Sequence, residues 1–260
     1  MLIIQKGFPL FPLLLISAAA SGAVQHTIPV EPFHAVDLSI KAIMRVEQAP
    51  LTSVVVTGDP RLVPCVSAST QDGRLTIGWA GRSDRAVQSQ AAGDTVIVTA
   101  RTNCDRRNGS QPLIIEVSAP DIHAIDITSE EGGSAEILPL RAKDFAASIH
   151  GRGSITINNL HASNAQLSID GIGRIKATGD VGTLAIRIPG SGAIDTASAH
   201  VSALTIAIAG QGDIAAAVDG PATGTIGGKG RIVIQGRPQC AIRNMGKGQV
   251  ICPAAIPHGG

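Results

Sequence analysis

The sequence predicts an all-β protein that folds as a parallel β-solenoid with about 18–20 residues per coil. Three observations lead to this prediction: a glycine-rich repeat of nearly constant period, apolar alternation on both sides of each repeat, and an unusual composition. Of 260 residues, 44% are hydrophobic but only 2% are aromatic, with 30 glycines and no tyrosine. Such a chain can bury a sizeable core, and that core must consist of small and β-branched side chains.

The first segment, residues 1–23, is expected to be a signal peptide. Lys6 supplies its positive charge, a short apolar run covers residues 10–20, and small residues follow at the cleavage positions. The alternatives are a membrane anchor and a buried helix, but the run is short for a bilayer, and Pro9 and Pro12 interrupt its start. The mature chain is therefore expected to be exported, to the periplasm or the cell surface, without a transmembrane segment.

The C-terminal half, residues 121–252, carries a repeat built on a Gly-x-Gly pair. Degenerate copies stand at Glu131 and Gly246, and the intervals between successive copies are 20, 20, 19, 20, 18 and 18 residues. Regular self-similarity of this kind is the signature of a repeat architecture. The complete copies supply ten turn glycines: Gly151 and Gly153, Gly171 and Gly173, Gly190 and Gly192, Gly210 and Gly212, Gly228 and Gly230.

Each glycine pair is flanked by apolar residues at every second position, which is the period of a β-strand. Isoleucine stands two residues before the first glycine in all five complete copies, and again four residues after it. Helical repeats need longer periods, and leucine-rich repeats need a leucine pattern that is absent. Stacked parallel strands satisfy the whole pattern, with glycines placed where the chain turns sharply with positive φ. The isoleucines concerned are Ile149, Ile169, Ile188, Ile208 and Ile226 before the pair, and Ile155, Ile175, Ile194, Ile214 and Ile232 after it.

The section before residue 121 shows apolar alternation at a similar spacing but less regularly. Examples are Val36–Ile40, Val54–Val56 and Leu75–Ile77. Its connections are longer and more polar. We interpret it as an irregular N-terminal section, reaching to about residue 120, of one solenoid domain that spans residues 24–252. The alternative is a separate β-sandwich that ends near Pro120. Residues 253–260 form a C-terminal tail.

Four cysteines in an exported chain suggest disulfides. Three pairings can be drawn, and we favour the two that are local in sequence, Cys65 with Cys104 and Cys240 with Cys252. Cys240 and Cys252 lie six residues on either side of Gly246, in columns that hold inward-facing residues in other coils. A bridge between them would close the last coil. Zinc is the alternative, but no CxxC or histidine pair has ligand spacing, so no metal or cofactor is expected.

Composition narrows the function classes. The 21 basic and 20 acidic residues balance, so the overall charge does not favour binding to nucleic acid. Few aromatic rings are present to stack on bases or sugars. An enzyme acting on polysaccharide would need carboxylates gathered on one solenoid face. The carboxylates near the turns do not share a column, because Asp170 precedes a glycine, Asp213 follows one and Asp195 lies further on. Only one histidine, His150, adjoins a turn, so we interpret the charged residues as a solvated face. These charged residues are Asp170, Arg174, Arg187, Asp195, Asp213 and Arg231.

A resemblance to a known family follows from the order of several motifs. Residues 33–38 (FHAVDL), 54–59 (VVVTGD) and 72–77 (DGRLTI) precede the I-x-G-x-G-x-I units, and this order resembles the head GIN domain family of auto-transporter adhesin heads. The resemblance covers about residues 28–252. It implies a right-handed parallel β-helix on an exported bacterial protein and carries no catalytic motif. The chain departs from the family's pattern at residues 131–133 and in its four cysteines.

The function expected from the sequence is that of a noncatalytic exported module for binding or structure in the bacterial cell envelope, related to adhesion. Its partner would be an envelope protein or polysaccharide, and the open ends of a solenoid would allow self-association. No individual catalytic or binding residue is nominated. The alternative function is an envelope polysaccharide lyase or hydrolase that uses Asp and Arg on a solenoid face.

Overall fold

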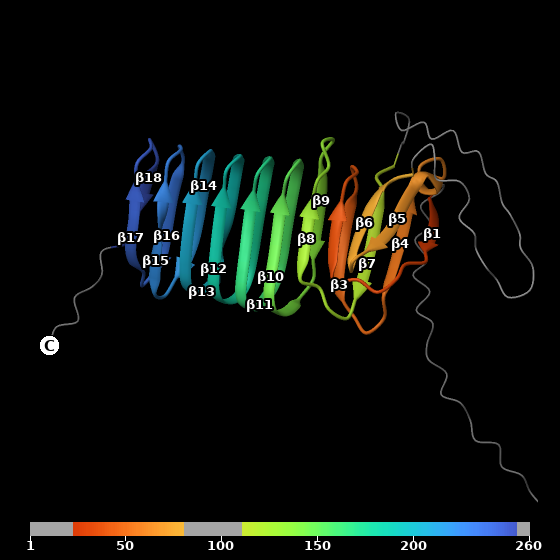
Figure 1. Ribbon diagram of the computed structural model, residues 1–260, viewed down its shortest axis with the longest axis horizontal. Helices are drawn as coiled ribbons and strands as arrows, with labels where there is room; N and C mark the ends of the chain where they lie inside the picture. The colour runs from red at the N-terminus through yellow and green to blue at the C-terminus, as the bar shows by residue number, and fades with distance from the viewer. Residues whose placement is uncertain (1–22, 81–110, 254–260) are drawn as a thin grey trace, which may run out of the picture.

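The computed structural model describes residues 23–80 and 111–253. They form an elongated stack of β-coils, with the irregular N-terminal strands at one end and the last coils at the other (Figure 1). Within these ranges there are strands and one short 3-10 helix but no α-helix. The predicted β-solenoid is therefore confirmed. The expected signal peptide, apart from Ala23, and the tail after Pro253 lie outside the described residues, as does Cys104.

Each coil of the regular half crosses two faces of the solenoid. Face A carries the strand segments that end just before a glycine pair, and face B carries those that begin just after it. Several strands run from face B of one coil around to face A of the next, so a single strand belongs to both faces. The strands are β8 (Ala124–Ile127), β9 (Gly133–Ile137), β10 (Leu140–Ile149), β11 (Arg152–Ile169), β12 (Ile172–Ile188), β13 (Ser191–Ile208), β14 (Gln211–Val218), β15 (Pro221–Ile226), β16 (Arg231–Gly236), β17 (Gln239–Asn244) and β18 (Gln249–Ile251).

Equivalent residues of successive repeats are paired in register and stack on one another. Ile155 pairs with Ile175, which pairs with Ile194, and these pairings are parallel. Neighbouring parallel strands lie about 4.8 Å apart, so the isoleucines form continuous columns through the core. All ten isoleucines of the repeat are at most 2% exposed. A core of such columns is narrow, which accounts for the near absence of large aromatic side chains.

The turn glycines are needed for a different reason from the one expected. Among the ten, only Gly230 has φ in the positive region, at 141°. A Cβ on Gly171 would instead come closer than 3 Å to the carbonyl oxygens of His150 and Gly151 in the preceding coil. A Cβ on Gly173 would collide with the Ile149 side chain below it. Close stacking of backbone on backbone, rather than a left-handed turn, excludes side chains here.

The N-terminal section contains two further parallel coils whose order in space differs from their order in the chain. On face A, β2 lies between β6 and β8, and on face B, β3 lies between β7 and β9. The coil made of β6 and β7 therefore lies outside the coil made of β2 and β3, although it comes later in the sequence. The elements are β1 (Val24–Ile28), β2 (Ala35–Leu38), β3 (Ile43–Gln48), β4 (Ser53–Gly58), η1 (Val63–Cys65), β5 (Val66–Gln71), β6 (Arg74–Trp79) and β7 (Ile114–Ala119).

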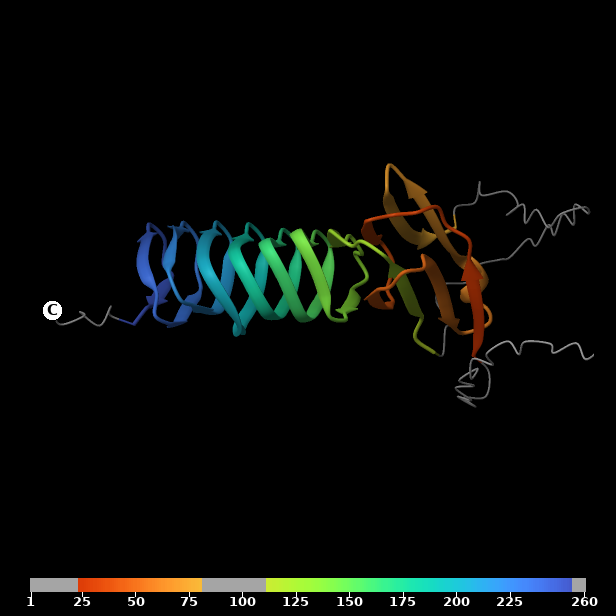
Figure 2. The ribbon, with the colours of Figure 1, turned by 90° about the horizontal axis from the view of Figure 1, so that it is seen from below.

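Antiparallel strands cover this end of the solenoid, as Figure 2 shows. β4 pairs with β7, β1 pairs with β4, and β5 pairs with β6, all antiparallel. The alternation at Val54–Val56 thus belongs to an antiparallel strand, not to another parallel coil. Asp72 and Gly73 join β5 to β6 with positive φ at both residues, the conformation of a tight hairpin turn. One cluster of buried apolar residues runs from Phe33 to Ile234.

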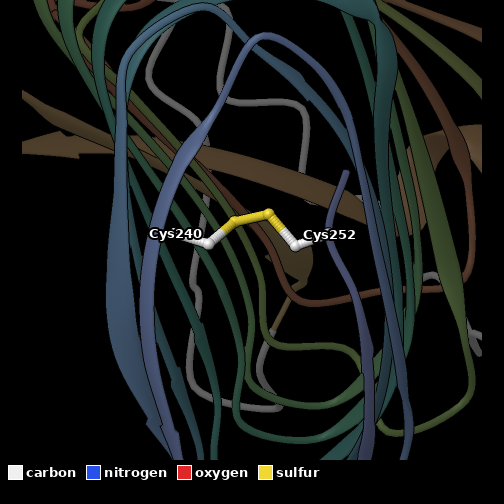
Figure 3. The surroundings of a disulfide bond; sticks show 2 residues. All are labelled: Cys240 and Cys252. Atoms are coloured by element: carbon white, nitrogen blue, oxygen red, sulfur yellow. A yellow bond between two sulfur atoms is a disulfide. The ribbon is translucent and has the colours of Figure 1, made fainter. Parts of the chain in front are cut away.

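The far end is closed by a disulfide. Cys240 in β17 and Cys252, just after β18, are bonded across the open end of the last coil (Figure 3), with Cα atoms 6.7 Å apart. The bond joins face A to face B at the last coil of the described residues. Cys65 is also disulfide-bonded, and Cys104, its expected partner, lies outside the described residues.

Candidate functional site

A row of polar side chains lies on the outside of face A, where the N-terminal section meets the regular coils. Asp37 in β2 is in register with Asp126 in β8, which is in register with Ser148 in β10. Each of these residues stands one position before a buried apolar residue that ends its strand. Strand alternation therefore turns all three side chains outward, on adjacent strands.

Hydrogen bonds join this row to neighbouring side chains. Arg74 in β6 pairs with Asp126, whose other carboxylate oxygen accepts a hydrogen bond from the Ser148 hydroxyl. The Thr128 hydroxyl donates to Asp37 Oδ1 at 2.8 Å. Both carboxylates consequently have partners, and their side chains are held in fixed orientations.

The adjoining turns add an imidazole and a third carboxylate. His150 and Asp170 occupy the same position in successive turns, directly before a turn glycine. His150 Nδ1 lies 2.9 Å from Asp170 Oδ2, and His150 Nε2 lies 3.1 Å from the Ser148 hydroxyl oxygen. We call the seven residues of this network the polar site: Asp37, Arg74, Asp126, Thr128, Ser148, His150 and Asp170.

Asp170, His150 and Ser148 make the contacts of a Ser-His-Asp triad, but the wider network opposes nucleophilic catalysis. Ser148 has one hydroxyl proton, and it is donated to Asp126, so His150 is not placed to remove it. The backbone N–H groups of the adjoining turn are also engaged, since His150 and Gly151 donate to Ile127 and Arg152 donates to Ser129. These three N–H groups are therefore not free to stabilise an oxyanion. The arrangement is suited to holding a ligand by hydrogen bonds.

The electrostatic environment of Asp37 differs from that of an ordinary surface carboxylate. Burial is the largest influence on the pKa of Asp37 and raises it, and the neighbouring Asp126 raises it further. The Thr128 hydrogen bond and the charges of Arg74 and His150 lower the pKa, but the net shift is upward. Because the folded pKa exceeds the unfolded value, ionised Asp37 costs stability at neutral pH. This cost is lost as the pH falls through the raised pKa of Asp37 toward 3.8, the ordinary pKa of an aspartate side chain.

The substitution Asp37→Asn is accordingly expected to raise the melting temperature at pH 7, and the gain should be smaller at pH 4, because the cost of ionised Asp37 is lost as the pH falls through its raised pKa. Asp219→Asn is the control of opposite sign. The hydrogen bonds from Arg237 lower the pKa of Asp219, so this change should lower the melting temperature at pH 7. Thermal unfolding at both pH values measures the two effects. A gain for Asp37→Asn that persisted unchanged at pH 4 would contradict the assignment.

The structure separates the charged residues considered from the sequence. Asp170 belongs to the polar site. Arg187 extends the row of Asp37, Asp126 and Ser148 on face A, because Ser148 is in register with Ser168 and Ser168 with Arg187. The others lie on face B: Arg174, Asp195, Asp213 and Arg231. Asp195 accepts a hydrogen bond from the backbone of Ala197, and Asp213 accepts one from the backbone of Arg231. The face B carboxylates thus serve local backbone structure.

Sequence reasoning did not single out Asp37, Arg74, Asp126 or Ser148. A signal was available, since Val36-Asp37-Leu38 and Ile125-Asp126-Ile127 share one pattern, an Asp between two apolar residues. That pattern places each carboxylate on the outer face. It does not reveal that strands 89 residues apart in sequence are neighbours.

Two shallow grooves lie elsewhere on the regular coils. One, of about 400 Å³, runs along the turn opposite the glycines and includes His161, Asp180 and His200. Asp180 lies in register between the two histidines and contacts His161 Nδ1 at 3.2 Å. The other, of about 610 Å³, crosses the glycine turns of the last coils between Lys229 and Lys247. Both grooves are open to solvent, and neither encloses a small molecule.

Comparison with known protein families gives one match. A family model described as "Putative auto-transporter adhesin, head GIN domain" matches residues 32–238. No curated protein sequence matches the chain significantly.

Several solved structures share the fold. A protein of Bacteroides fragilis NCTC 9343 titled "putative adhesin" superposes with a TM-score of 0.73 at 18% identity, over 89% of this chain and 97% of that one. A "putative lipid binding protein" of Parabacteroides distasonis ATCC 8503 gives 0.56 at 15% identity, over 90% and 98%. A "putative adhesin" of Parabacteroides merdae ATCC 43184 gives 0.55 at 16%, over 90% and 98%. At such identities the likeness shows the fold alone.

Proposed function

Because the chain belongs to the auto-transporter adhesin, head GIN domain family, we propose that it is an exported, noncatalytic binding module of a bacterial cell envelope that acts in adhesion. The rod presents long outer faces rather than an enclosed cavity, a shape suited to an extended partner. Among residues 23–80 and 111–253, no helix has the length and hydrophobicity needed to cross a bilayer.

The polar site supplies the observation that carries the proposal. It displays three carboxylates, an imidazole, a guanidinium group and hydroxyls on one outer face, and His150 and Asp170 are exposed by 50% and 38%. Carboxylates with free lone pairs accept hydrogen bonds from hydroxyl groups, and Arg donates them. A polysaccharide lying across face A would meet both kinds of group. We therefore propose an envelope polysaccharide as the ligand, in preference to an envelope protein.

Hydrolysis or lysis of that polysaccharide is the second candidate function, and one observation favours it. Asp37 and Asp126 lie on adjacent strands in direct register, so their backbones are about 4.8 Å apart, and the pKa of Asp37 is raised as that of a general acid would be. Glycosidases use paired carboxylates on either side of the scissile bond. Here both carboxylates lie side by side on an open face and are occupied by Thr128, Arg74 and Ser148. Binding is thus better supported than catalysis.

The test is a screen of the purified chain against envelope polysaccharides, with both binding and turnover measured. Asp126→Asn is expected to weaken binding at least about tenfold, since hydrogen bonds to a charged group are lost. Asp195→Asn, on face B, is the matched control: it removes the same charge, keeps an acceptor for Ala197, and should leave affinity unchanged.

Three outcomes separate the alternatives. Selective loss of affinity in Asp126→Asn supports binding at the polar site. New reducing or unsaturated ends in the polysaccharide would replace the noncatalytic proposal with the enzymatic one. Binding that survives in Asp126→Asn, or no polysaccharide bound at all, would overturn the proposed ligand.

A further inference from the structure

Charge is segregated along the chain despite the overall balance. Residues 121–219 contain 11 acidic and 6 basic side chains, whereas residues 220–260 contain 5 basic and no acidic ones. The five are all exposed and all fall within the last two coils, between β15 and β18. They are Lys229, Arg231, Arg237, Arg243 and Lys247.

Four of these side chains surround the glycine edge of the solenoid. Lys229 and Lys247 occupy the same turn position in successive coils, and their backbone N–H groups donate to Gly210 and Gly228 at 3.0 and 2.9 Å. Arg231 lies on face B, in register with Gln249, and Arg243 lies on face A, in register with Thr225. Arg237 is separate, since it pairs with Asp219 at the opposite turn.

Within residues 23–80 and 111–253, the four basic side chains around the glycine edge take part in no ion pair. The carboxylate of Asp213 accepts a hydrogen bond from the backbone N–H of Arg231. Two exposed apolar side chains lie among the four basic ones, Met245 directly before Gly246 and Ile251 on face B, exposed by 66% and 44%. We call this surface the basic end: Lys229, Arg231, Arg243, Met245, Lys247 and Ile251.

We propose that the basic end docks on an anionic phospholipid surface. Clustered Lys and Arg are attracted to the negative potential of such a membrane, by a factor of roughly five in affinity for each charge. The exposed Met245 and Ile251 distinguish this partner from a soluble polyanion, because apolar side chains gain free energy at the boundary between headgroups and acyl chains. The glycine turns between the lysines carry no side chains, so nothing there holds the edge away from the surface.

Docking in this way leaves the polar site free. Lys229, the member of the basic end nearest to Asp170 along the stack, follows β15 directly, so the coils of β12 and β13 lie between the two residues. Three strand steps from β11 to β15 correspond to about 14 Å, and a fourth step to β17, which carries Arg243, makes about 19 Å. The membrane contact therefore goes beyond the proposed polysaccharide binding and does not depend on it.

The experiment is co-sedimentation of the purified chain with two kinds of vesicle. One kind contains phosphatidylcholine alone, and the other contains phosphatidylcholine with about 30% phosphatidylglycerol, which makes its surface anionic. Binding is expected only to the anionic vesicles and should weaken about tenfold or more between 50 and 500 mM salt, because screening shortens the reach of the charges. The triple variant Lys229→Gln, Arg243→Gln, Lys247→Gln should bind roughly 100-fold more weakly.

A matched control removes the same charge from earlier coils. Arg152→Gln, Arg174→Gln and Lys176→Gln alter exposed side chains, and the first two share the columns of Lys229 and Arg231. This variant should bind vesicles within about twofold of wild type, since the basic end is intact. Met245→Ser is expected to weaken binding a few-fold even at high salt, because the apolar contribution is not screened.

Several results would overturn the proposal. These are equal binding to both kinds of vesicle, equal losses in the two triple variants, and binding to soluble polyphosphate without binding to vesicles. The last result would assign the basic end to an anionic polymer. Self-association that is abolished by the Lys229, Arg243, Lys247 triple variant, without vesicle binding, would assign it to a second copy of this chain.

Discussion

Gly228→Ala is expected to lower the local free energy of opening of β15–β18 by about 3 kcal/mol, because overpacking in a close-packed region has this order of cost. A Cβ at this position would come closer than 3 Å to the carbonyl oxygens of Ala209 and Gly210 in the preceding coil. These atoms belong to the hydrogen-bonded ladder, in which Gly210 accepts from Lys229. The ladder cannot move aside without losing its bonds, so the strain is not relieved.

The adjacent residue provides the control. A Cβ on Gly227 would meet only the Ile208 carbonyl oxygen, at an ordinary 3.7 Å, so Gly227→Ala should change stability by less than about 0.5 kcal/mol. Native-state hydrogen exchange of the amides in β15–β18 measures both variants, and a cost of about 3 kcal/mol corresponds to roughly 100-fold faster exchange. Equal effects of the two substitutions would show that close stacking is not what requires glycine at Gly228.

Ile169→Ala is expected to lower the free energy of unfolding by about 3–4 kcal/mol, within the range measured for large-to-small core substitutions. Ile169 is fully buried and stacks in register on Ile149. Backbone ladders hold the coil above and the coil below at fixed spacing, so the space left by the missing atoms cannot collapse. Much of the cavity cost therefore remains.

Ile172 gives the comparison for this prediction. It lies three residues further along, beyond the glycine Gly171, and is 54% exposed. Ile172→Ala removes the same atoms from a surface position and should cost less than about 0.5 kcal/mol. Chemical denaturation with a common slope for both variants gives the two values. A small effect of Ile169→Ala would mean that neighbouring coils repack around the cavity.

Much of the fold could be predicted because the same local pattern is repeated. The isoleucines equivalent to Ile149 and Ile155 recur every 18–20 residues. The strand period of one copy therefore applies to every coil. Cys240 and Cys252 could be placed by the same columns, and they are bonded across the last coil. The reason for the turn glycines could not be predicted, since it depends on the distance between coils and not on the conformation of one residue.

The N-terminal section illustrates where local pattern is insufficient. Apolar alternation predicts strands at Val36–Leu38, Val54–Val56 and Leu75–Ile77, all of which are present. Alternation is the same in parallel and antiparallel strands, so it does not show that β4 runs antiparallel to β7 or that β6 lies outside β2. Those arrangements depend on the tight turn at Gly73 and on pairings between residues far apart in the chain.

By itself, the sequence determined that this protein is a β-solenoid, that its coils contain 18–20 residues, and that isoleucine columns fill its core. These properties follow from periodicity, which is local. Only the tertiary structure decided that the carboxylates of Asp37 and Asp126 share one face with His150. The tertiary structure also decided that four basic side chains, which form no ion pair within the part of the chain that the structure describes, gather around the glycine edge of the last coils. Such surfaces are made by strand register between distant segments, because outward-facing residues contribute nothing to the core pattern that specifies the fold.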